Sequence, residues 1–570
     1  GLPVILSEKF HMKLAKLLVL LLAGAVLVPA QTGWGRTQTR SMTMTQRGIA
    51  ATSQILASQT GARILARGGS AADAAIASNA VLGLVEPMMD GMGGDLFVLY
   101  WDAKAKEYIG LNASGPAPQA LTPQFLAGKG IKEMPTVGIH TVTVPGAVDV
   151  WAKMHQRFGK LPWKDLFDDA IFYAEQGFPV TEVIQEQWAD PVNVKKLQAN
   201  AESVRVFLPG GKPLQAGEVF RNPDLARAYR LIAEKGRDAF YKGEIATAIV
   251  KTSQALGGSM TAADLAAFSS EWVKPISTDY RGWRVLELPP NGQGMAALEM
   301  LNIMQTSPAS PAGPFSPAEM HKRIEAMKLA YADLRKYDAD PRGYDVPVAT
   351  LLSKEWAARR ARLIDPARAN CKVTPGNIKS GDTTYLTIVD RDGNMASWIQ
   401  SIAHAWGSAV TVEGMGIMLH NRGWGFTLDP TDPDVLAGGK RPFHTIIPAF
   451  MDKGDTRIGF GIMGGANQPL AHAQFASNIV DFGMNIQQSM EAPRFTKNIA
   501  AGCDVSIEMR VPAATLQVLS ERGHEILIRR EFTQEMGRGQ AILHDAKTGV
   551  NYGASDPRAD GAAVPETPKP

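Results

Sequence analysis

A segment that is apolar on nearly every side, residues 70–86, most strongly constrains the fold of this chain. It is rich in alanine and has no broad polar face that could lie against water. A helix that is apolar all round is normally buried. Ser70 and Asp73 occupy the N-cap and the third helical position, close to the capping-box pattern, which predicts that the helix begins after Ser70.

A buried strand is predicted next, over residues 96–101, and a glycine-rich stretch separates it from the helix. That stretch contains Gly91, Gly93 and Gly94. A phosphate-binding loop runs from strand to glycine to helix, whereas the order here is helix, glycine, strand. The glycines therefore indicate close backbone packing rather than a dinucleotide site.

Helices dominate the middle of the chain, where residues 151–257 have a mainly helical pattern. Another helix is predicted over residues 317–337, because Ser316 suits the N-cap and Pro317 suits the first helical position.

Strands dominate the last third of the chain. Residues 384–389 and 395–402 are predicted to form a hairpin around a turn at 390–394. A further strand, 457–463, precedes a helix that begins near Pro469. Helices mixed with antiparallel hairpins, without strand–helix–strand alternation, predict an α+β fold built in layers.

Composition excludes several classes of protein. The chain has 570 residues, of which 45% are hydrophobic and 20% charged, as in ordinary globular proteins, so a disordered or polytopic membrane protein is excluded. Its length suits three or four domains or one large fused core. A net charge of +3 is too balanced to indicate a nucleic-acid partner. Two cysteines, Cys371 and Cys503, can form at most one disulfide, and the sequence leaves open whether they do.

The N-terminus has the pattern of an export signal. Lys13 and Lys16 precede an apolar run of 12 residues, 17–28, which is too short for a membrane span of ~20 residues. We therefore predict that residues 1–30 are an N-terminal extension plus a signal peptide, cut after Ala30. The mature protein is expected to be periplasmic or secreted, with no membrane contact beyond export.

Familiar catalytic and cofactor motifs do not occur in the sequence: it has no G-x-S-x-G, no C-x-x-C and no Walker motif. His321 and Glu325 are four residues apart on the predicted helix, but two ligands make a poor metal site. We expect an exposed helix face there, and neither a metal nor a cofactor.

Two short pairs remain. Thr383-Thr384 stands at the front of a predicted strand, where threonine is a good β-former. Gly464-Gly465 stands between a strand and a helix, where closely spaced N–H groups could bind an oxyanion. A tight turn would explain the same glycines, and the pattern alone leaves both alternatives open.

With these pairs, a series of ordered motifs along nearly all of the chain resembles the gamma-glutamyltranspeptidase family, also called glutathione hydrolases. The motifs that carry the resemblance are Gly68-Gly69-Ser70-Ala71-Ala72-Asp73-Ala74-Ala75, Glu86-Pro87, Gly91-Met92-Gly93-Gly94, Val144-Pro145-Gly146, Gly258-Ser259-Met260-Thr261, Tyr280-Arg281-Gly282 with Pro289-Pro290, Asp382-Thr383-Thr384-Tyr385, Lys440-Arg441-Pro442, Gly464-Gly465 and Tyr552-Gly553-Ala554-Ser555-Asp556-Pro557-Arg558. Any single motif would be only a hypothesis, but so many in order leave little room for chance.

The resemblance implies an N-terminal-nucleophile hydrolase, a four-layer αββα sandwich with one fused core from two self-cleaved subunits. The precursor would be cut between Asp382 and Thr383. A large subunit, residues 31–382, and a small subunit, 383–570, would stay together as a heterodimer.

The resemblance also implies the catalytic roles. Thr383 would be the nucleophile, and its freed α-amino group would be the base. Gly464 and Gly465 would stabilise the oxyanion. Ser401 stands where the family usually has a threonine that hydrogen-bonds the nucleophile, and the substitution keeps the hydroxyl.

Substrate-binding positions depart from the family pattern. Ser114 stands where an arginine holds the glutamyl α-carboxylate, and a serine cannot replace a bidentate guanidinium. Ala403 replaces a substrate-binding asparagine, and Gly425 replaces an aspartate that grips the α-amino group. His444-Thr445 replace a pair of serines.

Arg422 and His444 are alternative ligands for a substrate carboxylate, although packing or surface roles would also explain them. The connection from Gly425 to Lys440 is shorter than the family's lid loop. The rebuilt positions resemble the branch of cephalosporin acylase-like and oxamate amidohydrolase-like proteins.

The sequence therefore predicts a secreted, self-processing threonine amidohydrolase that acts on a small-molecule amide. The family favours gamma-glutamyl amides such as glutathione, whereas the missing arginine favours a non-glutamyl acyl amide. A non-catalytic binding protein on the same scaffold is the alternative from another class, and the retained Thr383, Ser401 and Gly464-Gly465 count against it.

Overall fold

The computed structural model describes residues 38–373, 382–497 and 501–568. Backbone contacts divide the chain into Gly1–Thr39 and Arg40–Pro570, and the second unit holds the helices and strands described below. The predicted extension and signal peptide, residues 1–30, lie outside the described residues. None of the helices in the described part combines the length and apolar character that a membrane span requires.

Two seven-stranded antiparallel sheets form the centre of the second unit. The first contains, in spatial order, β1 (Thr43–Thr45), β20 (Val550–Ser555), β19 (Arg538–Asp545), β15 (Thr456–Met463), β14 (Ala449–Lys453), β9 (Trp283–Glu287) and β8 (Ile276–Tyr280). The second contains β21 (Ala562–Pro565), β2 (Ile49–Thr52), β10 (Asp382–Val389), β11 (Met395–Ala403), β3 (Asp95–Asp102), β4 (Glu107–Asn112) and β7 (Glu271–Val273). In both sheets, strands from before and after residue 382 lie side by side.

Alternating side chains along each strand explain how the sheets are covered on both faces. In β3, Phe97 and Leu99 pack between the two sheets. Leu96 and Val98, which point the other way, pack against helices. Both faces of β3 are therefore buried, as predicted for residues 96–101.

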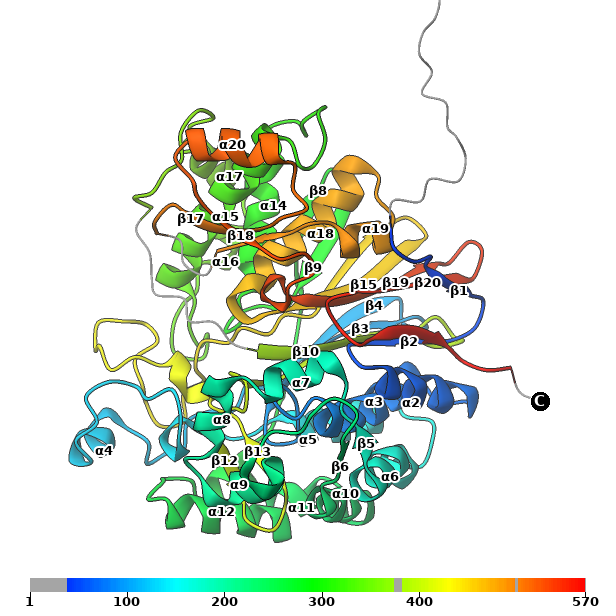
Figure 1. Cartoon of the computed structure of the whole chain (residues 1–570), viewed down its shortest axis with the longest axis vertical. Helices are drawn as coiled ribbons and strands as arrows, with labels where there is room; N and C mark the ends of the chain where they lie inside the picture. Colours follow the sequence, from blue (N-terminus) through cyan, green and yellow to red (C-terminus); the bar gives the residue numbers. More distant parts are fainter. Residues whose placement is uncertain (1–37, 374–381, 498–500, 569–570) are drawn as a thin grey trace, which may run out of the picture. The chain divides into compact units, whose positions relative to one another are not determined.

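Helices cover the outer face of each sheet (Figure 1). The second sheet is covered by α2 (Ile55–Ala66), α3 (Ala71–Val85), α5 (Ala147–Phe158), α6 (Asp168–Gln176) and α10 (Pro223–Lys235). The first sheet is covered by α14 (Gly294–Met304), α15 (Pro317–Tyr337) and α18 (Gln468–Phe482). The predicted four-layer αββα sandwich is thus confirmed.

Shorter elements complete the described chain. The helices are α4 (Pro123–Gly128), α7 (Glu182–Trp188), α8 (Pro191–Leu197), α9 (Ala201–Phe207), α11 (Asp238–Tyr241), α12 (Glu244–Ala255), α13 (Ala262–Ala267), α16 (Val348–Leu351), α17 (Lys354–Ala361), α19 (Ile486–Glu491) and α20 (Ala513–Glu521). The strands are β5 (Phe178–Pro179), β6 (Val219–Phe220), β12 (Val410–Val412), β13 (Ile417–Leu419), β16 (Phe495–Thr496), β17 (Asp504–Glu508) and β18 (Glu525–Arg529).

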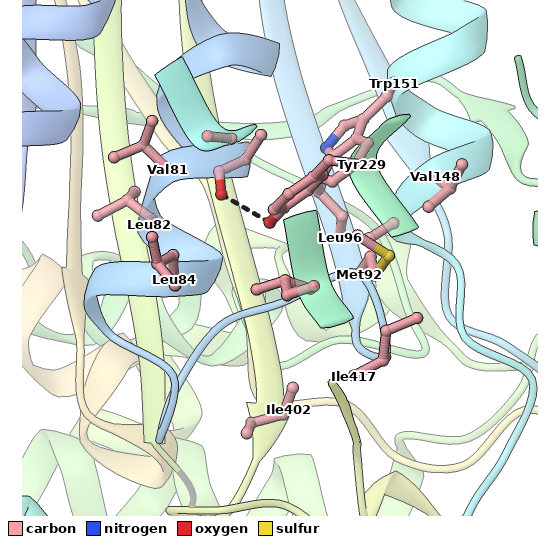
Figure 2. Packing of buried hydrophobic residues seen from close by; sticks show 14 of the residues in the cluster. Val81, Leu82, Leu84, Met92, Leu96, Val148, Trp151, Tyr229, Ile402 and Ile417 are labelled. Atoms are coloured by element: carbon pink, nitrogen blue, oxygen red, sulfur yellow. Dashed lines mark hydrogen bonds between the residues drawn. The ribbon is translucent and has the colours of Figure 1, made fainter. Parts of the chain in front are cut away.

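Helix α3 is buried along its whole length, as its composition predicted. The capping box is present, since Ser70 Oγ accepts from the N–H of Asp73 and the Asp73 carboxylate accepts from the N–H of Ser70. Figure 2 shows apolar side chains packed around this helix and the hydroxyl of Tyr229 donating to the carbonyl oxygen of Ala80, 2.7 Å away. The hydroxyl of this buried tyrosine is thereby satisfied inside the core.

Other sequence predictions are confirmed within about two residues. β10 and β11 form the expected antiparallel hairpin, and α15 spans the predicted residues with Ser316 as its N-cap. The glycines before β3 allow close packing, because a Cβ on Gly94 would lie 2.4 Å from the carbonyl oxygen of Ser401. Between the sheets, a Cβ on Gly461 would lie 2.4 Å from the ring of Tyr385, so only glycine admits that ring.

The C-terminal motif contains a buried ion cluster. The guanidinium of Arg558 forms a fork with Glu508, with Nε 2.8 Å and Nη2 2.7 Å from the two carboxylate oxygens. Its Nη1 lies 3.0 Å from Asp556, which also pairs with Arg494. The side chains of Arg558, Glu508 and Asp556 are fully buried, so these charges depend on one another.

We predict that Arg558→Met lowers the free energy of unfolding by about 3–5 kcal/mol, because it removes the shared buried partner of Glu508 and Asp556 and leaves them only their single contacts with Arg510 and Arg494. The matched control is Arg530→Met. The side chain of Arg530 is 64% exposed and pairs with the half-exposed Glu186 on the surface, where a pair contributes about 0–1 kcal/mol. Chemical denaturation of both variants measures the difference, and equal losses would contradict the dependence on burial.

Candidate active site

Thr383 lies near the start of β10, at an irregularity in the sheet. Asp382 is opposite Ala403 and Thr384 is opposite Gln400, so the register shifts and leaves Thr383 without a ladder partner. Such bulges redirect a side chain and occur often beside active sites. Thr383 itself is fully buried.

Gln468 contacts the hydroxyl of Thr383. Its Nε2 donates to Thr383 Oγ1 over 3.1 Å, and its Oε1 accepts from the N–H of Ile447 over 3.1 Å. Because both ends of the amide are occupied, the donor is held toward the hydroxyl. Gln468 was not predicted from the sequence, where its only signal is its position three residues after Gly465.

The Gly464-Gly465 pair forms the sharp turn between β15 and α18. Both residues have positive φ, +134° and +57°, which glycine adopts readily. The carbonyl oxygen of Gly465 accepts from Nε2 of Gln293 over 2.7 Å, and the same amide donates to the carbonyl oxygen of Thr445. Gln293 and Gln468 therefore tie the turn and the segment around Thr445 to the start of β10.

Ser401 and Ala403 end β11 beside the predicted cleavage point. Ser401 Oγ accepts from the N–H of Ala403 over 2.7 Å. Ala403 has a φ of +77°, a conformation that a residue with a Cβ adopts at a cost. Its pairing with Asp382 puts this strained residue opposite the peptide bond that is predicted to be cut.

A buried carboxylate, Asp95, gathers three basic side chains next to Ser401. Asp95 begins β3 and is the sheet partner of Ser401. Its Oδ2 lies 2.9 Å from Nε2 of His444 and 3.4 Å from Nδ1 of His420. The Nε of Arg422 lies 3.8 Å from the same oxygen.

The environment fixes the charges of this cluster. Burial raises the pKa of Asp95, but the charge and hydrogen bond of His420 and the hydrogen bond of His444 outweigh it and hold the pKa below its ordinary value. Burial, aided by the charge of Arg422, lowers the pKa of His444 to about 3. Burial also lowers the pKa of Arg422 to about 10. At neutral pH, Asp95 is therefore ionised, His444 neutral and Arg422 cationic.

Arg422 keeps unused donors. Its Nη1 donates to Thr445 Oγ1 over 3.0 Å, whereas Nε and Nη2 have no hydrogen-bond partner among the described residues. The side chain is fully buried. A buried guanidinium with unpaired N–H groups is costly unless an acceptor reaches it.

Ser114 adjoins this cluster through Asn291. Ser114 Oγ accepts from Nδ2 of Asn291 over 2.9 Å, and the carbonyl oxygen of Asn291 accepts from the N–H of His444 over 2.8 Å. The next residue, Gly115, donates its N–H to Asp95 over 3.3 Å. The structure thus brings Ser114, Arg422, His444 and Thr445 together, and Asp95 and Asn291, which connect them, were missed from sequence.

Gly425 belongs to the same turn as Arg422 and lies at the edge of a cavity of about 510 Å³. A Cβ at this position would lie 2.8 Å from the carbonyl oxygen of Phe443, so the glycine lets the turn pack against the segment that carries His444. Among the described residues that line the cavity are Arg335 and Asp434, but not Thr383.

The expected exposed helix face at His321 and Glu325 is wrong, because both side chains are buried. His321 Nδ1 lies 2.8 Å from Nε2 of His524, and its Nε2 lies 2.8 Å from the carbonyl oxygen of Asp365. Glu325 pairs with Lys328 over 2.7 Å. Helix amphipathicity failed here because C-terminal residues cover this face of α15, and the polar groups form a hydrogen-bonded network.

The pKa of His444 predicts how stability depends on pH. The unfolded histidine has a pKa near 6.5, so between about pH 6.5 and pH 3 the unfolded chain binds a proton that the folded chain does not. Acidification through this window therefore removes stability, by up to about 1.4 kcal/mol per pH unit.

We expect His444→Gln to lower the free energy of unfolding at neutral pH, because it disturbs the contact with Asp95. The difference in free energy of unfolding between the variant and wild type should shrink as the pH falls below about 6.5. Only wild type has the buried neutral histidine whose contribution to stability is lost on acidification. Urea unfolding at several pH values measures this, and a difference independent of pH would refute it.

The family described as Gamma-glutamyltranspeptidase matches residues 57–566 of the chain. The Glutathione hydrolase-like YwrD proenzyme of Bacillus subtilis is 37% identical over 514 residues, which cover 89% of this chain and 96% of that protein. The Oxamate amidohydrolase proenzyme of Klebsiella pneumoniae is 34% identical over 534 residues, which cover 92% of this chain and 99% of that protein.

A solved structure extends the likeness to the fold. The crystal structure of cephalosporin acylase from Bacillus halodurans superposes with a TM-score of 0.87 at 40% identity, covering 94% of this chain and 99% of that one. Sequence and fold agree along nearly the whole chain, and the protein therefore belongs to the gamma-glutamyltranspeptidase family of hydrolases and acylases.

Proposed function

We propose that this protein is a self-processing amidohydrolase whose nucleophile is Thr383 and whose substrates are amides with an anionic acyl group. The observation that carries the proposal is the environment of Thr383: an unpaired, buried position at the start of β10, with Gln468 held against its hydroxyl. Family membership supports the same residue, because the Asp382-Thr383 motif matches the family's cleavage point.

Maturation would begin with attack by Thr383 Oγ1 on the carbonyl carbon of Asp382. The C–N bond breaks, an ester joins the two residues, and the amine of Thr383 is released. Water then opens the ester, which leaves a carboxylate on Asp382 and restores the hydroxyl. The step needs no protease, because nucleophile and target are adjacent in one strand. The positive φ of Ala403 places strain opposite this bond.

Turnover would use the groups that this cut releases. The α-amine of Thr383 has an expected pKa near 7.7–8.0, so much of it is neutral at working pH and can take the hydroxyl proton. The hydroxyl attacks the substrate amide, the amine of the substrate leaves, and water or an acceptor amine removes the acyl group. N–H groups of Gly464 and Gly465 would stabilise the oxyanion by about 2.7–4 kcal/mol each.

Recognition of the acyl group would fall to Arg422. Its Nε and Nη2 have no hydrogen-bond partner among the described residues, although Nε faces Asp95 over 3.8 Å, and together they could bind a carboxylate in bidentate fashion. The serine at position 114 cannot do so. Gly425 supplies no carboxylate for an α-amino group, so glutaryl-like and oxamate-like amides suit the site better than gamma-glutamyl amides. The second candidate, a gamma-glutamyl amide such as glutathione, is favoured by family membership and by the glutathione hydrolase-like relative.

We further propose that the enzyme acts in the periplasm or outside the cell. The predicted export signal supports this location, and so does a disulfide between Cys371 and Cys503, because such bonds persist mainly in oxidising compartments.

The first prediction from this function is that Thr383→Ala yields an uncut, inactive chain of near-native fold, because the attacking hydroxyl is absent. Thr383→Ser should still be cut, more slowly, since it keeps a hydroxyl. Intact-mass measurement should find new ends at Asp382 and Thr383 in wild type. Full activity from a chain that is entirely uncut would exclude the free-amine mechanism, and cleavage with turnover in Thr383→Ala would identify another nucleophile.

The second prediction is that gamma-glutamyl anilide is a poorer substrate than glutaryl anilide. The two acyl groups share the carboxylate and differ only in the α-ammonium of the glutamyl group, which has no carboxylate partner at Gly425. A missing hydrogen bond to a charged group costs roughly 1.5–3 kcal/mol, or about ten- to a hundredfold in kcat/KM. Steady-state kinetics on both anilides and on an oxamate amide measures the ranking. A gamma-glutamyl value well above all others would rule out the rebuilt acyl pocket.

Arg422 can be tested in the same assay. Arg422→Gln should lower kcat/KM for glutaryl anilide by about ten- to a hundredfold relative to uncharged butyryl anilide. The ratio of the two substrates serves as an internal control, because a loss of folded enzyme lowers both equally. Arg422→Lys keeps the charge without the fork and should lie between wild type and Arg422→Gln.

A further inference from the structure

The chain's two cysteines stand on opposite sides of the proposed cut. Cys371 is 11 residues before Asp382, and Cys503 lies in the part that would become the small subunit. The structure joins them in a disulfide, with their Cα atoms 4.9 Å apart. We propose that this bond covalently links the large and small subunits of the mature enzyme, an inference that rests on the proposed cleavage.

Backbone hydrogen bonds hold the two sides of the bridge together. The N–H of Gly502 donates to the carbonyl oxygen of Cys371 over 3.2 Å. The N–H of Ala369 donates to the carbonyl oxygen of Arg522 over 2.8 Å. Both bonds join a residue before the cut to a residue after it. The disulfide therefore lies at the edge of a hydrogen-bonded seam between the two future subunits, with Cys503 5% exposed and Cys371 exposed to solvent.

The segment that carries Cys371 is also anchored within its own subunit. The N–H of Asn370 donates to Glu325 over 3.2 Å, and Nζ of Lys328 donates to the carbonyl oxygen of Asn370 over 3.1 Å. Both partners lie on α15. On the same helix, His321 contacts His524 across the seam. Helix α15 therefore contacts both the segment that carries Cys371 and the C-terminal segment on the other side of the bridge.

Formation of the bond and cleavage of the backbone are chemically independent. The two thiols lose two protons and two electrons to the disulfide of a thiol–disulfide oxidoreductase, whose sulfurs become two thiols as the new S–S bond forms. Hydrolysis between Asp382 and Thr383 adds one water and leaves the S–S bond intact. A cut chain with an intact bridge remains one molecule.

The bridge changes what happens when the cut enzyme unfolds. Without it, two separate chains would have to meet again, so the unfolding midpoint would depend on protein concentration. With the disulfide in place, the effective concentration of one piece around the other is on the order of millimolar and does not change when the protein is diluted.

The test compares purified mature enzyme, with free thiols blocked by N-ethylmaleimide, on denaturing gels and by intact mass without and with reductant. We expect one species without reductant that contains both pieces, and two species after reduction. Two species in both conditions would overturn the covalent link while leaving the cleavage in place. One species in both conditions would overturn the cleavage itself, and this proposal with it.

A variant without the bridge tests the consequence. Cys371→Ser/Cys503→Ser should keep wild-type kcat/KM, because neither residue belongs to the proposed catalytic machinery. Its denaturation midpoint should fall on about tenfold dilution, whereas that of the oxidised wild type should not move. If the double substitution folds poorly, reduced wild type takes its place. A midpoint that does not depend on dilution in either protein without the bridge, the double variant or reduced wild type, would overturn the role of the bridge.

Discussion

The buried carboxylate of Asp95 organises the region around the candidate nucleophile. A charge in this position must have partners, and His444, His420 and Arg422 supply them from two segments that are distant from β3 in the sequence. Since Asp95 is paired through the backbone with Ser401, those segments are fixed against the strand that lies beside β10. The position of the acyl-binding candidates relative to Thr383 thus depends on one ionic contact and one strand pairing.

Two glutamines extend this arrangement to the other sheet. Gln293 bonds the backbone at Gly465 and Thr445, and Gln468 bonds Ile447 and Thr383. Amide side chains suit this position because each offers a donor and an acceptor at fixed spacing. Together they connect two places that come from different sheets. One is the turn that follows β15 of the first sheet, and the other is the start of β10 in the second sheet.

Local pattern predicted the elements well, because helices such as α3 and hairpins such as β10–β11 are specified by nearby residues. The αββα layering came from the family resemblance, and the motifs of that resemblance contain several structural residues such as Arg558. Asp95, Asn291 and Gln468 could not be predicted, since their partners are far away in sequence and only the fold brings them together. The burial of His321 was mispredicted for the same reason: residue 524 covers it from more than 200 positions away.

The interleaving of strands bears on when the proposed cut could occur. If the stretch before Thr383 were made alone, β2 would lack β10 and β3 would lack β11, and their unpaired edges would be open to association with other chains. The two parts of the chain share both sheets, so neither part contains a complete sheet by itself. If the chain is cut before Thr383, as proposed, a continuous backbone would bring these interleaved strands together first, and the cut would follow in a chain whose sheets are already paired.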